Sequence, residues 1–329
     1  MIMEQFLIGV DVGGTNVRMG IVTTEGKILK KIHYPTDISK EGLVLFESLL
    51  SKLKDFIKNQ IKGTDHLIGI GIGTAGTIDI HRGIITDSPN LLNLKGFALK
   101  DFLKKRISYP IVIENDANAF TLGEGWVGAA KGSLHYCGLT LGTGVGGGIV
   151  INGEILHGAD GMAGEIGHMV IDPEGPLCGC GGRGCLEVYA SGTGIRQMAL
   201  EMIGKENGEG LLKWCGGDPE KITSAKVYEA AQSGDSTARW IFNEMGRYLG
   251  LGLVNLIHLF NPERIVIGGK VSRAWDYFIQ NAKETIEQRA MKGPREKVKI
   301  LQAECGDDAG ILGAAYVAMK KAMGKRHKA

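Results

Sequence analysis

The chain has 329 residues, of which 43% are hydrophobic and 22% are charged, and its formal net charge is +2. This composition excludes an intrinsically disordered chain and is typical of a globular protein. The small net charge points to no acidic, nucleic-acid or membrane partner. A chain of this length is too long to fold around one hydrophobic core of ordinary size, so we expect two domains of about 100–200 residues each.

The first part of the chain shows short apolar runs and one helical pattern. The first residues include neither a basic segment nor a long apolar stretch, so we expect no secretion or membrane insertion and a cytoplasmic protein. Strands are predicted at 7–12, 17–22, 28–32, 67–73 and 111–113, with a helix over 41–61 whose apolar residues recur at threes and fours.

The second half alternates in the same way. Helices are predicted over 238–260 and 275–290, and strands at 264–267 and 298–303. The first of these helices should end before Pro262. Residues 20–29 and 148–156 form similar hairpin patterns, each after a glycine-rich turn, which favours a fold of two similar halves. Two unrelated hairpins would give the same pattern.

Two glycine-rich turns are candidate phosphate loops, in a chain that holds 51 glycines. In the first, Asp11 ends a strand, Gly13 and Gly14 let backbone N–H groups approach an anion, and Thr15 offers a hydroxyl before Asn16. Asp11 suits the water shell of a Mg²⁺ ion that bridges phosphates. The alternative is a tight structural turn.

The second turn has the sequence LGTGVGGG and contains Gly142, Thr143 and Gly144. No lysine ends either glycine run, which disfavours a P-loop. The run leads into a strand pattern rather than a helix, which disfavours a dinucleotide-binding Rossmann site.

One imidazole and three thiols form a candidate metal site. His168, Cys178, Cys180 and Cys185 are the ligand set of a tetrahedral, structural Zn²⁺ with no open position, and the glycines between the cysteines allow a tight loop. The alternative is a set of free thiols in a reducing compartment.

A carboxylate flanked by two amides follows the strand at 111–113. Asp116 could accept a proton from an alcohol while Asn115 and Asn118 orient neighbouring hydroxyls. Taken alone, the segment could also be a polar turn.

Together these motifs resemble the ROK family of sugar kinases and repressors, and within it the bacterial glucokinases. The resemblance rests on DVGGTN at 11–16, ENDAN at 114–118, LGTGVGGG at 141–148, GEIGH at 164–168, CGCGGRGCLE at 178–187 and NPERIVIGG at 261–269. It implies an α/β fold of two actin-like (ribonuclease H-like, ASKHA) domains around a central cleft. The small domain would comprise 1–118 and 305–329, closed by a C-terminal helix over 309–323, and the large domain 119–304 with the zinc loop.

The resemblance also implies roles for individual residues. Asp116 would be the catalytic base, and the sugar would be bound by Gly76, Asn90, Asn115, Asp116, Glu165, His168 and Glu187. The nucleotide would contact Asp11, Gly13, Gly14, Thr15, Asn16, Gly142, Thr143, Gly144, Gly268 and Gly269. Many relatives have a third glycine where this chain has Lys270, which leaves the phosphoryl donor open, with polyphosphate as a variant.

The implied activity is phosphorylation of glucose by ATP with Mg²⁺, in a homodimer or homotetramer that binds no nucleic acid. N-acetylmannosamine, N-acetylglucosamine, fructose or allose are alternative substrates. A sugar-sensing regulator without catalysis is the alternative of a different class. We consider it the weaker one, because only some ten residues precede Asp11, too few for a helix-turn-helix.

Overall fold

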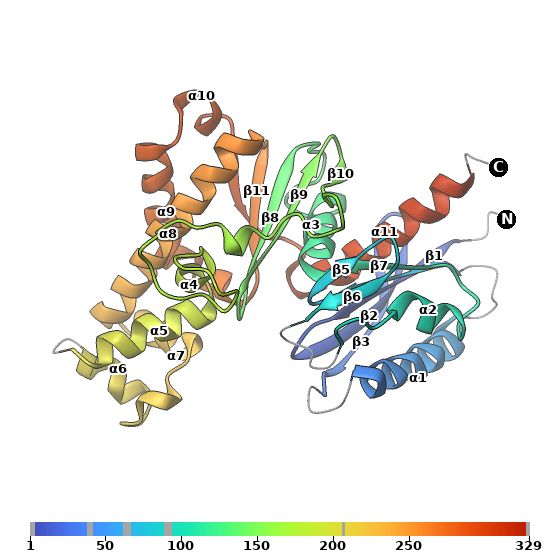
Figure 1. Cartoon of the computed structure of the whole chain (residues 1–329), viewed down its shortest axis with the longest axis horizontal. Coiled ribbons are helices and arrows are strands. Elements are labelled where there is room, and N and C mark those ends of the chain that lie inside the picture. The colour runs from blue at the N-terminus through green and yellow to red at the C-terminus, as the bar shows by residue number, and fades with distance from the viewer. Residues whose placement is uncertain (1–3, 38–41, 62–66, 89–93, 206–207, 327–329) are drawn as a thin grey trace. The chain divides into compact units, whose positions relative to one another are not determined.

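The computed structural model describes residues 4–37, 42–61, 67–88, 94–205 and 208–326 (Figure 1). Its contacts divide the chain into two compact units. Unit 1 comprises Met1–Ser133, Gly148–Gly164 and Glu304–Ala329, and unit 2 comprises Leu134–Gly147 and Glu165–Ala303. The units are defined by contacts alone, so the predicted domain ranges 1–118 with 305–329, and 119–304, stay a prediction.

Unit 1 is built on a five-stranded sheet with the order β3-β2-β1-β4-β7. Its strands are β1 (Phe6–Val12), β2 (Asn16–Thr23), β3 (Ile28–Pro35), β4 (Leu67–Thr74) and β7 (Ile111–Asn115). The first three form an antiparallel meander, and β4 and β7 continue the sheet in parallel from β1. A two-stranded sheet joins β5 (Thr77–Asp79) to β6 (Ile84–Asp87). Every strand predicted in this part of the chain is confirmed.

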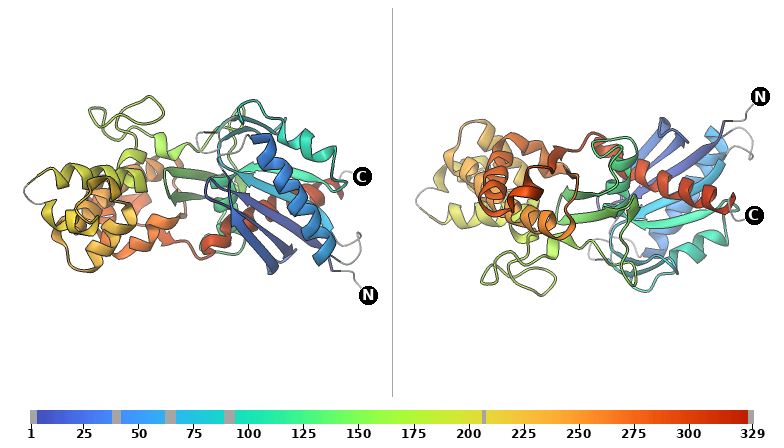
Figure 2. Two further views of the ribbon diagram at one scale, coloured as in Figure 1. Left: turned by 90° about the horizontal axis from the view of Figure 1, so that it is seen from below. Right: turned by 90° about the horizontal axis from the view of Figure 1, so that it is seen from above.

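Both faces of this sheet are covered by helices. They are α1 (Gly42–Gln60), α2 (Leu99–Lys104), α3 (Asp116–Trp126) and α11 (Ala309–Arg326). Side chains alternate along β1: Ile8 and Val10 join the core that includes α1, whereas Leu7 packs with α11. In the right view of Figure 2 the red helix α11 lies across the blue strands of this sheet. The helices predicted over 41–61 and 309–323 are confirmed within the described residues.

Helix α11 approaches the sheet so closely that two strand positions admit only glycine. A Cβ atom at Gly9 would lie 1.9 Å from the Ile311 carbonyl oxygen, and one at Gly71 would lie 1.7 Å from the Ala314 oxygen. Gly9 and Gly71 therefore serve helix–sheet packing rather than ligand binding.

The second sheet repeats the arrangement of the first, with the order β10-β9-β8-β11-β12. Its strands are β8 (Tyr136–Leu141), β9 (Val145–Ile151), β10 (Glu154–Ile155), β11 (Arg264–Gly268) and β12 (Lys299–Gln302). β10 pairs with β9 antiparallel, and β11 pairs with β8 and β12 in parallel. The two similar hairpins of the sequence fall on β2–β3 and on β9–β10, which hold matching places in the two sheets. The predicted internal repeat is therefore confirmed.

Unit 2 carries most of the remaining helices. They are α4 (Glu187–Ala190), α5 (Gly192–Ile203), α6 (Glu209–Trp214), α7 (Ser224–Gln232), α8 (Ser236–Phe260), α9 (Trp275–Arg289) and α10 (Lys292–Arg295). Short 3₁₀ helices are η2 (Ile166–His168), η4 (Pro219–Lys221) and η5 (Lys270–Ala274), and unit 1 holds η6 (Gly306–Asp308). As predicted, α8 stops before Pro262; its cap residue Asn261 is left-handed with φ 43°. No helix in the described part of the chain is both long and apolar enough to cross a membrane.

Candidate functional site

The turn that carries Asp116 joins β7 to α3 in unit 1. Asn115 is the N-cap of α3, with the extended angles φ −67° and ψ 146°. Its side-chain oxygen accepts hydrogen bonds from the N–H groups of Ala117 (2.9 Å) and Asn118 (3.0 Å). These bonds satisfy two of the free donors at the helix start and fix Asp116 as the first helical residue, where a negative charge is favoured.

Three predicted residues meet at this turn. The Asn115 amide nitrogen donates to the Gly76 carbonyl over 3.1 Å, and the Ala117 N–H donates to Asp116 Oδ1 over 2.9 Å. Gly76 has φ 107°, and a Cβ there would lie 2.4 Å from the Asp87 carbonyl oxygen, so only glycine fits. The structure thus brings Gly76, Asn115 and Asp116 together. Asn90 lies outside the described residues.

A second carboxylate, Asp11 at the end of β1, lies near Asp116. Burial, and after it the charge of Asp116, raises the pKa of Asp11 to about 6, although the Arg18 guanidinium 3.3 Å away opposes the shift. The start of α11 is close by, since a Cβ at Gly310 would lie 2.8 Å from Asp11 Cγ. The pair would be stabilised by a divalent cation, which favours ionised carboxylates.

The first glycine turn is anchored at both ends. The Gly13 N–H donates to the Asn16 carbonyl (3.0 Å), and the Thr36 N–H donates to the Thr15 carbonyl (2.9 Å). The Thr36 hydroxyl donates to the Gly13 carbonyl over 2.7 Å. The Gly13 N–H is therefore engaged inside the turn, and phosphate contacts by Gly13, Gly14, Thr15 and Asn16 stay a prediction.

In unit 2 the second glycine turn is held by the start of α5. The Gly192 N–H donates to the Gly142 carbonyl (2.8 Å), and Gly142 N–H donates to the Gly144 carbonyl (2.9 Å). The Thr193 hydroxyl donates to the Thr143 carbonyl over 2.8 Å. As predicted, a strand rather than a helix follows this turn, which argues against a Rossmann site.

The IGG motif lies beside the same turn. Gly268 pairs with Thr140 near the end of β8. Gly269 has φ 88°, and a Cβ atom there would lie 2.4 Å from the Leu141 carbonyl oxygen, so only glycine fits. The structure thus brings Gly268 and Gly269 next to the start of the glycine turn. Lys270 is exposed at the start of η5.

The four predicted metal ligands cluster in unit 2. Ligand atoms of His168, Cys178, Cys180 and Cys185 all lie within 4.8 Å of one another. Cys180 Sγ and Cys185 Sγ are 3.7 Å apart, and Cys178 Sγ is 3.6 Å from His168 Nδ1. Four ligands around a tetrahedral ion with Zn–S bonds of about 2.3 Å would place sulfur atoms about 3.8 Å apart. The donor set and its spacing therefore fit a closed zinc site, although the identity of the ion stays a prediction.

Backbone turns at glycine shape this loop. Gly181 and Gly184 have φ 90° and 61°, and the Cys178 N–H donates to the Gly182 carbonyl over 2.8 Å. A Cβ at Gly184 would lie 1.4 Å from the Asp172 carbonyl oxygen. Gly181 and Gly184 are therefore required by geometry, as the sequence indicated, whereas a Cβ at Gly179 or Gly182 would meet no atom closer than 3.5 Å.

Three predicted sugar ligands adjoin the metal cluster. Glu165 is the N-cap of η2, and the His168 N–H donates to its carbonyl over 3.0 Å. Reduced hydration raises the pKa of Glu165; His168 opposes this shift, and the charge of Glu187 adds to it. The residue nevertheless stays exposed. Because Nδ1 of His168 faces Cys178, its Nε2 is the nitrogen left for a ligand. A helical turn between Glu165 and His168 was predicted and is confirmed.

Glu187 links the metal loop to the second glycine turn. Its Oε2 accepts the Val145 N–H over 2.9 Å, and its Oε1 lies 3.8 Å from Cys178 Sγ. A Cβ at Gly144 would lie 2.2 Å from Glu187 Oε2. Gly144 is therefore needed for contact with Glu187, a role that the sequence did not suggest.

Sequence reasoning missed two pairs of supporting residues. Tyr189 donates to Asp172 Oδ2 over 3.0 Å beneath the cysteine loop. In unit 1, Glu114 and His157 form a similar pair, with Glu114 Oε2 2.8 Å from His157 Nε2. Each pair joins segments distant in sequence, so no local pattern reveals it.

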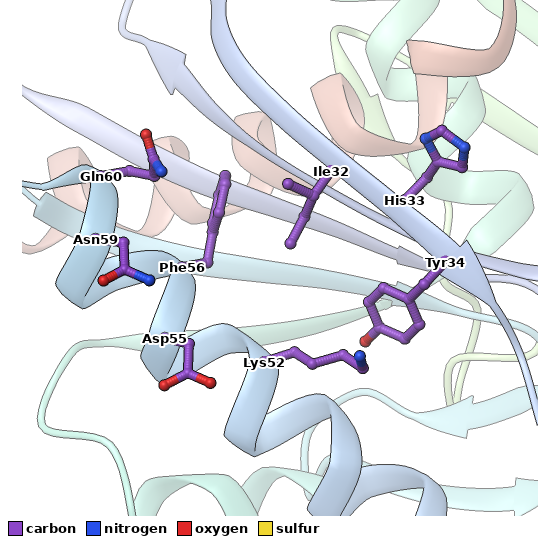
Figure 3. A pocket seen from close by; sticks show the side chains of 8 residues that line it. All are labelled: Ile32, His33, Tyr34, Lys52, Asp55, Phe56, Asn59 and Gln60. Atoms are coloured by element: carbon purple, nitrogen blue, oxygen red, sulfur yellow. The ribbon is translucent and has the colours of Figure 1, made fainter.

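A surface hollow of about 340 Å³ lies between β3 and α1 (Figure 3). Its lining includes Tyr34 and Lys52, whose Nζ is 4.4 Å from the tyrosine ring centre. The residues that line it include none of the predicted site residues, so it is separate from the chemistry described above.

The sequence matches the family model described as the ROK family over residues 7–321. The chain belongs to the ROK family. This ROK chain is 39% identical to the glucokinase of Halalkalibacterium halodurans, over 95% of each chain. It is also 39% identical to the glucokinase of Thermotoga maritima, over 94% of this chain and 96% of that relative.

Among solved structures, the ROK family glucokinase of Streptomyces griseus in complex with glucose and AMPPNP matches with a TM-score of 0.80 and 34% identity. The match covers 96% of this chain and 99% of that one. The predicted α/β fold of two actin-like domains is thereby confirmed.

Proposed function

We propose that this ROK protein is an ATP-dependent sugar kinase that phosphorylates glucose to glucose 6-phosphate, with Asp116 as the general base. The observation that carries the proposal is the capped turn at Asn115, which holds the Asp116 carboxylate at the first position of α3 beside Asp11. Relatives named glucokinase at 39% identity support ATP-dependent phosphorylation of a sugar, and the S. griseus relative was solved with glucose and AMPPNP.

In the proposed reaction Asp116 removes the proton from the terminal sugar hydroxyl. The hydroxyl oxygen forms a bond to the γ-phosphorus of MgATP, the bond from that phosphorus to the β,γ-bridging oxygen breaks, and ADP leaves. The proton stays on the Asp116 carboxylate until solvent takes it. General-base assistance of this kind contributes about 10²–10⁴-fold to the rate.

The nucleotide is bound by the two glycine turns and the IGG motif. Asp11 holds the water shell of the Mg²⁺ that accompanies ATP, which suits a carboxylate whose ionisation is disfavoured without a cation. Backbone N–H groups of the turns contact phosphates, and Gly268 and Gly269 lie against the nucleoside.

The sugar hydroxyls are bound by Glu165, His168 and Glu187, together with Asn115. The cluster of His168 and the three cysteines would hold a Zn²⁺ ion, and because all four ligands would come from the protein, the ion would order the loop and take no part in the chemistry. His168 would serve twice: Nδ1, which faces Cys178 Sγ, would bind the metal, and the Nε2–H would donate to the sugar.

The test is phosphate transfer from MgATP to glucose, followed as ADP release. Asp116→Asn should lower kcat by about 10²–10⁴-fold and leave the melting temperature near that of the wild type. Full activity of Asp116→Asn would rule out Asp116 as the general base. If the wild type prefers N-acetylmannosamine, N-acetylglucosamine, fructose or allose in a hexose panel, that sugar rather than glucose is the substrate. Failure to phosphorylate any sugar would favour a regulator.

Two expectations accompany the proposal. We expect a homodimer or homotetramer in the cytoplasm, which light scattering and cell fractionation would examine. Polyphosphate in place of ATP would test the donor, because Lys270 stands where many relatives have glycine.

A further inference from the structure

Glu114 is a buried carboxylate that spans the turn carrying Asp116. Its side chain is only 3% exposed. Oε1 accepts hydrogen bonds from the Asn115 N–H and from the Asn118 side-chain amide, each over 3.0 Å. These donors stand one residue before and two residues after Asp116, so a single carboxylate oxygen ties both sides of the turn.

The other oxygen of Glu114 is held by His157. His157 Nε2 lies 2.8 Å from Glu114 Oε2, and the imidazole is 27% exposed. The Glu114 hydrogen bond is the first cause of a raised pKa at His157. A buried carboxylate needs partners on both oxygens, because an unpaired one loses its hydration without compensation.

His157 opens the segment that leads to Glu165. The Ala163 N–H donates to the His157 carbonyl over 3.1 Å, which closes the segment on itself. Gly161 has φ 95°, and a Cβ there would lie 2.5 Å from the Ile78 carbonyl oxygen, so the segment packs tightly on β5. The position of His157 is therefore fixed by backbone contacts that do not involve Glu114.

We propose that His157 is a positioning residue for the phosphoryl-transfer reaction: by donating from Nε2 to Glu114, it locks the carboxylate that sets the position of the Asp116 turn. This inference rests on the proposed function, because it assigns to His157 an effect on the base of that reaction. His157 and Glu114 touch neither substrate. Their effect passes through Asn115 and Asn118 to the backbone of Asp116.

The expected signature is a fall in kcat with little change in nucleotide binding. A misplacement of about 1 Å at a reacting group can lower the rate by about 10²-fold. His157→Leu removes the donor and should lower kcat by about 10- to 100-fold, with KM for MgATP within about two-fold of the wild type. If His157 had a purely structural role, His157→Leu would lower the melting temperature and the amount of active enzyme, but kcat per active enzyme would stay that of the wild type.

Three further variants make the test specific. His157→Gln retains an N–H donor at nearly the distance of Nε2 and should restore kcat to within about three-fold of the wild type. His157→Asn is polar but too short, and should stay as impaired as His157→Leu. It keeps the test open if the leucine variant fails to fold. His81→Leu replaces an exposed histidine of the same unit, and should match the wild type.

The wild type is first assayed with MgATP and a panel of hexoses, and the variants are then compared with the best sugar. A kcat order of wild type and His157→Gln above His157→Asn and His157→Leu supports the inference. Equal kcat for His157→Leu and the wild type, or for His157→Gln and His157→Leu, would overturn it while the kinase stands. Absence of phosphorylation of every sugar by the wild type would overturn both.

Discussion

The Asp116 turn in unit 1 and the cysteine loop in unit 2 are held in place by different physical means. In the turn, the Asn115 cap and the Glu114 carboxylate satisfy the backbone donors around the base with bonds of 2.9–3.0 Å made by the protein itself. The loop also has backbone hydrogen bonds, such as that from the Cys178 N–H to the Gly182 carbonyl over 2.8 Å, but its thiols and imidazole approach one another at 3.6 and 3.7 Å, a spacing that an ion would complete.

If the cysteine loop binds the proposed ion, hydrogen bonds within the protein position the proposed base, whereas a metal orders the residues proposed to bind the sugar. Glu165 and His168 take their positions from a short 3₁₀ helix beside the thiol cluster, whereas Asp116 begins a regular helix. Removal of an ion should therefore affect sugar binding and leave the base in place.

The largest effect is expected at the metal loop. Cys185→Ser replaces a buried thiol of the cluster and should weaken zinc binding by more than about 100-fold, beyond the loss caused by altering an outer-shell partner. KM for glucose should rise with it. Metal analysis of the purified protein measures the loss, and Cys215→Ser, at a buried cysteine outside the cluster, is the matched control. Unchanged zinc content in Cys185→Ser would remove the contrast between the two regions.

The second prediction concerns Glu124, a carboxylate near the C-terminal end of α3. Glu124 is fully buried and accepts hydrogen bonds from the N–H groups of Ala129, Glu304 and Cys305. Glu124→Gln turns an amide N–H₂ group toward these donors and should reduce the free energy of unfolding by about 1.5–3 kcal/mol. Chemical denaturation measures it, with Glu47→Gln on the exposed face of α1 as the control. A loss that disappears after chelation would mean that α3 also depends on the ion.

The cap of α3 should have a smaller effect on stability. Asn115→Ala removes the acceptor for two backbone N–H groups and should reduce the free energy of unfolding by about 1 kcal/mol. The same loss is expected with and without a chelator, because the cap involves no metal ligand. Urea unfolding under both conditions checks this, and a chelator-dependent loss would contradict it.

The smallest effect is a pH dependence at His157. Its pKa is raised by Glu114, with a smaller contribution from Glu154, so its folded pKa exceeds the unfolded one. The pair therefore contributes stability below the unfolded pKa, and this contribution is lost as pH rises through the folded pKa. The difference in melting temperature between wild type and His157→Gln should shrink from about pH 6 to about pH 8.5. A difference that grows with pH would contradict the assignment.

Much of the fold followed from local patterns. The alternation in β1 and the spacing of apolar residues in α1 placed these elements within one or two residues of their ends. Helix α5 escaped prediction because it begins with Gly192, Thr193 and Gly194, which are poor helix formers. Its start is stabilised instead by the Ser191 cap and by the contact of Gly192 with the second glycine turn.

The candidate site was predictable where residues that act together are close in sequence. Glu187 begins α4 two residues after Cys185, the last cysteine of the loop, and Asn115 adjoins Asp116. The supports were not predictable, because Glu114 and His157 meet only through the fold. Glycine was ambiguous for the same reason: Gly71 serves the approach of α11 at Ala314, a contact that no local pattern reveals.

Hydrogen exchange with and without a strong zinc chelator compares the two regions in one experiment. Peptides covering 165–190 should exchange faster after chelation, whereas peptides covering 111–126 should keep their protection, because hydrogen bonds within the protein hold the Asp116 turn. Faster exchange at 111–126, or unchanged exchange at 165–190 after the metal is removed, would contradict this expectation.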